Sequence, residues 1–114
     1  MDIHFPTFEV AEPLGANIRV KLASGQLVAA DGTDTDHLGL TNLETFEAGE
    51  LVSLTPAGIP GTLKMVASGA IAQNAKFEYD DDGKIAAFGA GTARGVALDA
   101  ATADGDVIRV IEFK

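Results

Sequence analysis

The chain has 114 residues, which is enough for one domain with a hydrophobic core, and 46% of them are hydrophobic. The absence of cysteine excludes disulfides, thiolate zinc sites and cysteine nucleophiles. Seventeen acidic and eight basic residues give a net charge of −9, which disfavours nucleic acid and anionic membranes as partners. No apolar run approaches the ~20 residues of a membrane span, and the N-terminus lacks signal-peptide features, so we expect synthesis in a cytoplasm.

The first 13 residues are predicted to form an extended arm. Phe5 and Phe8 lie among polar residues without a helical period, and Pro6 lacks a backbone donor. The apolar side chains either pack on the domain as a first strand or stay exposed until a partner covers them. We therefore expect an arm over residues 1–13 and a single β domain over residues 14–114.

Alternating apolar and polar residues predict the first β-strand of this domain. Ile18, Val20 and Leu22 fall on one face of a half-buried strand, and Arg19 and Lys21 fall on the other. Further strands of the first half are predicted at residues 27–29, 38–40 and 51–54.

The second half of the chain repeats the pattern of the first. Two prolines and two glycines at 56–61 predict a linker between the halves. Gly39 and Gly95 are 56 positions apart, and so are Gly49 and Gly105, while the polarity of the intervening strands also matches. Coincidence among turn glycines is the alternative to a true repeat. The two copies span about residues 14–55 and 71–113.

Two copies of a β-meander, each too short to cover its own apolar face, would pack on one another. The sequence therefore predicts a mainly β fold, a compact β-barrel or β-sandwich built from two repeated β-meanders, with an extended N-terminal arm and little helix. The windows 43–48 and 99–104 could each hold about one helical turn, which is too short to be stable alone.

No group of residues predicts catalysis, so we expect no enzyme activity, no cofactor and no metal. The acidic run 78–83 resembles a calcium loop, but its closing ligand position falls on Gly89. Asp82-Gly83 is instead typical of a type I′ hairpin. His4 and His37 lie in predicted surface segments, without a serine, a cysteine or ligand spacing nearby.

Lys64 raises an alternative function from another class. Biotinyl and lipoyl carrier modules are also β domains of two halves, and they carry a modified lysine at an exposed hairpin tip, commonly between two methionines. In this chain Leu63 precedes the lysine, and 63–67 is predicted to be a strand. A carrier or small-ligand β module remains the alternative, which modification of Lys64 would favour.

Three segments resemble one known family. The run 95–110, preceded by 68–72 and 79–85, resembles the small capsid cement or head decoration proteins of tailed bacteriophages. This resemblance implies a structural virion protein that binds the major capsid protein on the outside of the expanded head and stabilises the shell against internal DNA pressure. It also implies a homotrimer at local three-fold axes.

The N-terminal arm is the predicted capsid contact. Its apolar residues are spaced nearly alternately, and Pro6 leaves a gap in any hydrogen-bonded ladder, which suits an added edge strand. Lambda-type decoration proteins, which this chain resembles in role, anchor such an arm to a sheet of the capsid subunit. Deletion of residues 1–8 is expected to abolish head binding and to leave the melting temperature nearly unchanged. The residues expected to bind the capsid by β-augmentation are Ile3, His4, Phe5, Pro6, Thr7 and Phe8.

Overall fold

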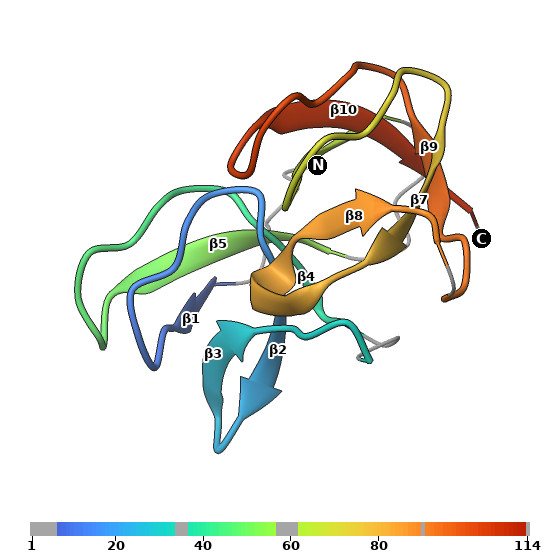
Figure 1. Cartoon of the computed structure of the whole chain (residues 1–114). Helices are drawn as coiled ribbons and strands as arrows, with labels where there is room; N and C mark the ends of the chain where they lie inside the picture. Colours follow the sequence, from blue (N-terminus) through green and yellow to red (C-terminus); the bar gives the residue numbers. More distant parts are fainter. Residues whose placement is uncertain (1–6, 34–36, 57–61, 90, 114) are drawn as a thin grey trace, which may run out of the picture.

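The computed structural model describes residues 7–33, 37–56, 62–89 and 91–113, which form two five-stranded antiparallel sheets (Figure 1). We call the described residues from 7 to 56 the first unit and those from 62 to 113 the second unit. The strands are β1 (Thr7–Glu9), β2 (Arg19–Ala23), β3 (Gln26–Ala29), β4 (Gly39–Thr41), β5 (Leu51–Pro56), β6 (Leu63–Val66), β7 (Lys76–Tyr79), β8 (Ile85–Ala87), β9 (Gly95–Ala97) and β10 (Val107–Glu112).

The two sheets share one strand order. The first is β1-β5-β4-β2-β3 and the second is β6-β10-β9-β7-β8, so each strand of the first unit has its counterpart five strands later. The mainly β prediction is confirmed, and the helix assigned in the described part is one 3₁₀ turn, Asp81–Gly83. The meander prediction is wrong, because a meander pairs only sequential strands, whereas β1 pairs with β5 and β2 pairs with β4, and the second sheet has the same order.

Neither sheet forms a closed barrel in the described part of the chain. The two end strands of each sheet meet at an isolated parallel bridge, Val10 with Leu27 in the first unit and Ala67 with Ile85 in the second. The two bridges lie at equivalent positions of the two units, which also share their strand order. Each sheet is therefore strongly curled but open.

Turn residues also occur in equivalent pairs. A left-handed backbone conformation requires φ > 0, which glycine and asparagine tolerate best. All residues of the described part with such a conformation fall into four pairs: Asn17 and Asn74, Ser24 and Asp82, Gly25 and Gly83, and Gly49 and Gly105. The predicted hairpin at Asp82-Gly83 is confirmed, since both residues have positive φ and the Lys84 N–H donates to the Asp81 carbonyl at 3.2 Å.

Alternation of apolar residues gives each sheet one buried face. In β10, Ile108 and Val110 are buried while Val107, Arg109 and Ile111 are exposed. The buried faces form two hydrophobic clusters, one in each unit. The clusters exchange one residue each, because Val66 of β6 packs in the first cluster and Leu40 of β4 packs in the second.

β2 differs from the alternation predicted for it. Arg19, predicted on the solvent face, is fully buried, and Leu22, predicted on the buried face, is 46% exposed. The reason is that the second unit packs on the start of β2 and covers Arg19, whereas the end of β2 projects beyond this contact as a hairpin with β3.

Residues 43–48 and 99–104 contain no helix, although the sequence predicts a helical turn in each. A carboxylate at the end of each connection, from Glu50 or Asp106, accepts hydrogen bonds from two backbone N–H groups of the same connection. These bonds satisfy donors that a helical turn would leave open, so the chain adopts tight non-helical turns instead.

Candidate functional site

β1 lies at one end of the first sheet and contains the described part of the predicted capsid contact. Thr7 pairs with Ser53 and Phe8 with Val52, both on β5. The other edge of β1 joins no ladder of the described strands, and the chain meets β3 there at the Val10–Leu27 bridge. Four of the predicted capsid-binding residues lie outside the described residues, namely Ile3, His4, Phe5 and Pro6.

Phe8 also has a structural role. Its side chain is partly buried and packs against the first hydrophobic cluster. Two residues later Val10 is fully buried, and its N–H donates to the Glu50 carbonyl at 3.0 Å. β1 is thus part of the first sheet, and deletion through Phe8 removes core contacts as well as an arm. From these contacts we expect deletion through Phe8 to lower the melting temperature, in place of the nearly unchanged value predicted from the sequence.

Arg19 connects the two units. Its Nη2 donates to the Asp80 carbonyl at 2.7 Å, and its guanidinium carbon lies 4.0 Å from the centroid of the Tyr79 ring. The Tyr79 hydroxyl donates to Glu112 Oε2 at 2.5 Å. Burial, followed by this carboxylate, raises the pKa of Tyr79 well above its usual range, so the phenol stays neutral. A buried cation over an aromatic face makes this a strong structural joint.

The turn Asp81–Gly83 completes the joint. The Gly83 N–H donates to the Ala30 carbonyl at 2.6 Å, and the Gly32 N–H donates to Asp81 Oδ1 at 3.1 Å. A Cβ atom at Gly83 would lie 2.5 Å from the Arg19 carbonyl oxygen, which is far inside van der Waals contact. Only glycine therefore allows this turn to approach β2 so closely.

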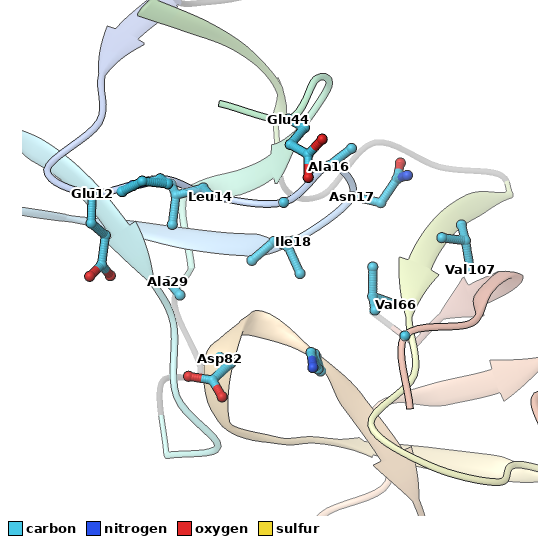
Figure 2. A pocket seen from close by; sticks show the side chains of 14 residues that line it. Glu12, Leu14, Ala16, Asn17, Ile18, Ala29, Glu44, Val66, Asp82 and Val107 are labelled. Carbon is cyan, nitrogen blue, oxygen red and sulfur yellow. The ribbon is translucent and has the colours of Figure 1, made fainter. Parts of the chain in front are cut away.

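A cleft of about 680 Å³ opens beside this joint, between the two units (Figure 2). Carboxylates of Glu12, Glu44 and Asp82 are spaced around it, and Ile18 and Val66 line its interior. Its one basic residue, Lys84, donates to Asp104 at 2.8 Å. The lining offers no nucleophile with a base beside it, so the cleft can exclude water and bury apolar groups but presents no catalytic arrangement.

The two residues considered for other chemistry are engaged structurally. His37 is buried with its ring 5.3 Å from Tyr79, edge to face, rather than in the surface segment predicted for it. Lys64 lies within β6 opposite Arg109 of β10, away from any hairpin tip, which removes the geometry that a carrier lysine needs. The described residues contain no group of three or more potential metal ligands and no helix long and apolar enough to cross a membrane.

A paired charge marks the outer face of the second sheet. Arg109 donates to both carboxylate oxygens of Asp99, from Nε at 2.9 Å and from Nη2 at 2.8 Å. These bonds hold the pKa of Asp99 at about 2. Both side chains reach the surface, so the pair contributes little to folding, and Asp99 offsets the charge of Arg109.

Sequence reasoning missed one feature of the surface, the apolar connection before β5. Leu43 is 70%, Phe46 is 72% and Leu51 is 67% exposed, the highest values among the large apolar residues in the described part. The signal that could have found them is a comparison of the two copies, since Asp99 and Thr102 occupy the positions equivalent to Leu43 and Phe46.

Comparisons with known proteins give a family and a fold. A family model described as phage cement protein matches residues 15–111. Among solved structures, the crystal structure of the head fiber gp8.5 N base in bacteriophage phi29 is similar to this chain, with a TM-score of 0.74 and 15% identity over 96% of this chain and 93% of that chain. At this identity the likeness shows the fold alone. A comparison with curated proteins gave no match.

Proposed function

The chain belongs to the phage cement protein family, structural proteins of the phage virion, and we propose that it binds the outside of the expanded head of a tailed phage and stabilises the shell. The observation that carries this proposal is the family match over residues 15–111, which begins after β1 and includes the strands from β2 to β10 except the last residue of β10. The cleft and the joint, which offer no catalytic arrangement, are consistent with a structural role.

The proposed capsid contact is the open edge of β1 together with residues 3–6. An edge strand has backbone N–H and C=O groups without partners on one side, and a strand of the major capsid protein can pair with them. Main-chain hydrogen bonds then supply affinity, and apolar side chains from Ile3 to Phe8 supply register.

We further propose that three copies cluster around a local three-fold axis of the head. Copies with a net charge of −9 repel one another in dilute solution, so a small interface between them is weak until the capsid holds the copies together. The proposal therefore combines a capsid contact for each copy with a weaker contact between copies.

The test is co-sedimentation with expanded heads that lack a decoration protein. Wild-type protein is expected to sediment with the heads and to raise the temperature at which they release DNA. A variant lacking residues 1–6 keeps β1 and Phe8, so it is expected to keep its melting temperature and to lose head affinity by about tenfold or more.

Two outcomes would count against these statements in different ways. If wild-type protein does not bind heads, the proposed function is wrong. If the variant lacking residues 1–6 binds with full affinity, the function stands and the contact lies elsewhere on the protein. Lys64→Gln is the matched control for the carrier alternative, and it is expected to bind heads like the wild type.

A further inference from the structure

The connection before β5 presents apolar side chains that folding of the unit does not need. We call Leu43, Phe46 and Leu51 the apolar patch. Single exposed apolar residues are common on protein surfaces, but three side chains with about 70% exposure within nine residues of sequence point to an interaction site.

The patch is held on a fixed backbone. Thr45 is buried in the middle of the connection and exchanges two hydrogen bonds with Leu14, each of 2.8 Å, through its own N–H and through its hydroxyl oxygen. The Gly49 N–H donates to the Val10 carbonyl at 2.8 Å. A connection anchored in this way loses little conformational entropy when it binds a partner.

The second unit provides an internal control for this connection. The Ala101 N–H donates to the Ile71 carbonyl and the Gly105 N–H to the Ala67 carbonyl, each at 2.8 Å. These bonds are equivalent to the ones that the N–H groups of Thr45 and Gly49 donate in the first unit. The same backbone is therefore built without apolar side chains at the positions of Leu43 and Phe46. Leu43 and Phe46 are not needed for the fold of the connection, whereas Leu51, the first residue of β5, has an exposed apolar counterpart in Val107.

Acidic residues surround the patch. Glu9 pairs with Leu51 across β1 and β5, so their side chains share a face, and Glu44 and Glu47 are exposed on the connection itself. The second unit has alanine at the positions of Glu44 and Glu47. Two copies that met patch to patch would place these glutamates against each other, which is unfavourable.

The outer face of the second sheet has the complementary character. Lys64 pairs with Arg109, and Val96 pairs with both Ile111 and Lys76, so these side chains share one face across β6, β10, β9 and β7. Lys64 and Lys76 are exposed and pair with no carboxylate of the described residues, while Arg109 is exposed but paired with Asp99, and Ile111 is 45% exposed. Glu78 lies two residues from Lys76 on the same face of β7, so the positive charge of this face comes from the two lysines. We call this surface the basic face. It combines apolar area with positive charge, as the patch combines apolar area with negative charge.

We propose that the apolar patch of one copy packs against the basic face of the next copy, in a head-to-tail contact that repeats around the three-fold axis. This inference rests on the proposed clustering of copies and names the two surfaces that form it. A head-to-tail contact uses two different surfaces of each copy, so it can close into a ring. The buried core of the contact is three side chains, well under the ~800 Å² per partner of a stable interface, so association in solution is weak.

Charge exchange tests the contact directly. Glu44→Lys/Glu47→Lys is expected to weaken self-association by about tenfold or more, because it places lysines against the basic face. Lys64→Glu/Lys76→Glu is expected to do the same from the other side. The variant with all four substitutions restores opposite charges in every copy, and it is expected to associate like the wild type.

Association is measured by sedimentation velocity over a range of concentrations and by chemical cross-linking of copies bound to heads. If the fourfold variant does not recover association, or if wild-type copies neither associate nor cross-link on heads, the proposal is wrong. If both double variants associate in solution like the wild type but Glu44→Lys/Glu47→Lys no longer binds heads, the patch contacts the capsid and the proposal is also wrong.

The apolar part has its own test. Phe46→Thr introduces the residue that the second unit carries at the equivalent position, so the fold should be kept, as an unchanged melting temperature would show. Cross-linking between copies of this variant is expected to fall several-fold. Head binding by the wild type is a separate measurement, and it tests the proposed function. Leu22→Thr removes an exposed apolar side chain of the β2–β3 hairpin, outside both surfaces, and is expected to leave cross-linking unchanged.

Discussion

The two units of this chain have one backbone plan and two different surfaces. They share strand order, bridge positions and left-handed turn positions, and a carboxylate closes the connection before the last strand of each. They differ in charge, because the first 57 residues contain nine acidic and two basic residues and the remainder contain eight acidic and six basic. Features present in both units serve folding, and features present in one alone indicate where the units meet each other or a partner.

The sharpest test of this comparison is a pair of equivalent glycines. Gly25 and Gly83 both have positive φ, but a Cβ atom at Gly25 meets nothing within 4 Å, whereas at Gly83 it meets Ile18 and the Arg19 carbonyl. Gly25→Ala is expected to cost about 1 kcal/mol of unfolding free energy for the backbone alone, and Gly83→Ala about 2–4 kcal/mol because overpacking is added. Urea unfolding measures both. Equal losses would show that the joint adjusts to the extra methyl group.

A second test compares the first residues of β2 and β7. Arg19 pairs with Leu40 and Lys76 with Val96, so the two cations occupy equivalent positions, one buried and one exposed. Arg19→Met is expected to cost about 1–3 kcal/mol, because it removes the cation over Tyr79 and leaves the Asp80 carbonyl without its donor. Lys76→Met should change unfolding free energy by less than about 0.5 kcal/mol. A large loss at Lys76 would mean that the second unit makes its own buried contact there.

The smallest expected effect concerns Asp106, whose carboxylate closes the second connection. Hydrogen bonds from the Thr102 N–H first, and then from Ala103, lower the pKa of Asp106 below its ordinary value of 3.8. Because the pKa is lower in the folded protein, the stabilisation is present above the ordinary value and is lost as the pH falls through the folded value. The difference in melting temperature between wild type and Asp106→Asn should therefore shrink in acid. A difference that stays constant from neutral to strongly acidic solution would contradict this.

Local signals predicted much of the fold. The hairpin at Asp82-Gly83 follows from backbone sterics, which sequence reveals directly. Most strands follow from alternation. The place of β1 beside β5 could not be predicted, because it depends on a pairing between segments about 45 residues apart in the chain.

Contacts between the units explain the remaining failures. Arginine and histidine are residue types common on protein surfaces. Arg19 and His37 are buried because Tyr79 and Asp80 of the second unit pack against them. The apolar connection before β5 escaped notice for another reason. Its pattern resembles a short amphipathic turn until the equivalent connection of the second unit is placed beside it, where Asp99 and Thr102 show that the apolar residues are not needed for folding.

The strand pairings have a consequence for the order of folding. Every ladder of the described strands joins segments from the same half of the chain, so the first sheet can form as soon as residue 56 has been synthesised. Domains whose contacts are complete early fold while the ribosome is still extending the chain, and this limits competing pairings with later strands of similar sequence. The joint around Arg19, and the places of Val66 and Leu40 in the two hydrophobic clusters, take groups from both halves, so these contacts can form only after the second half has been synthesised.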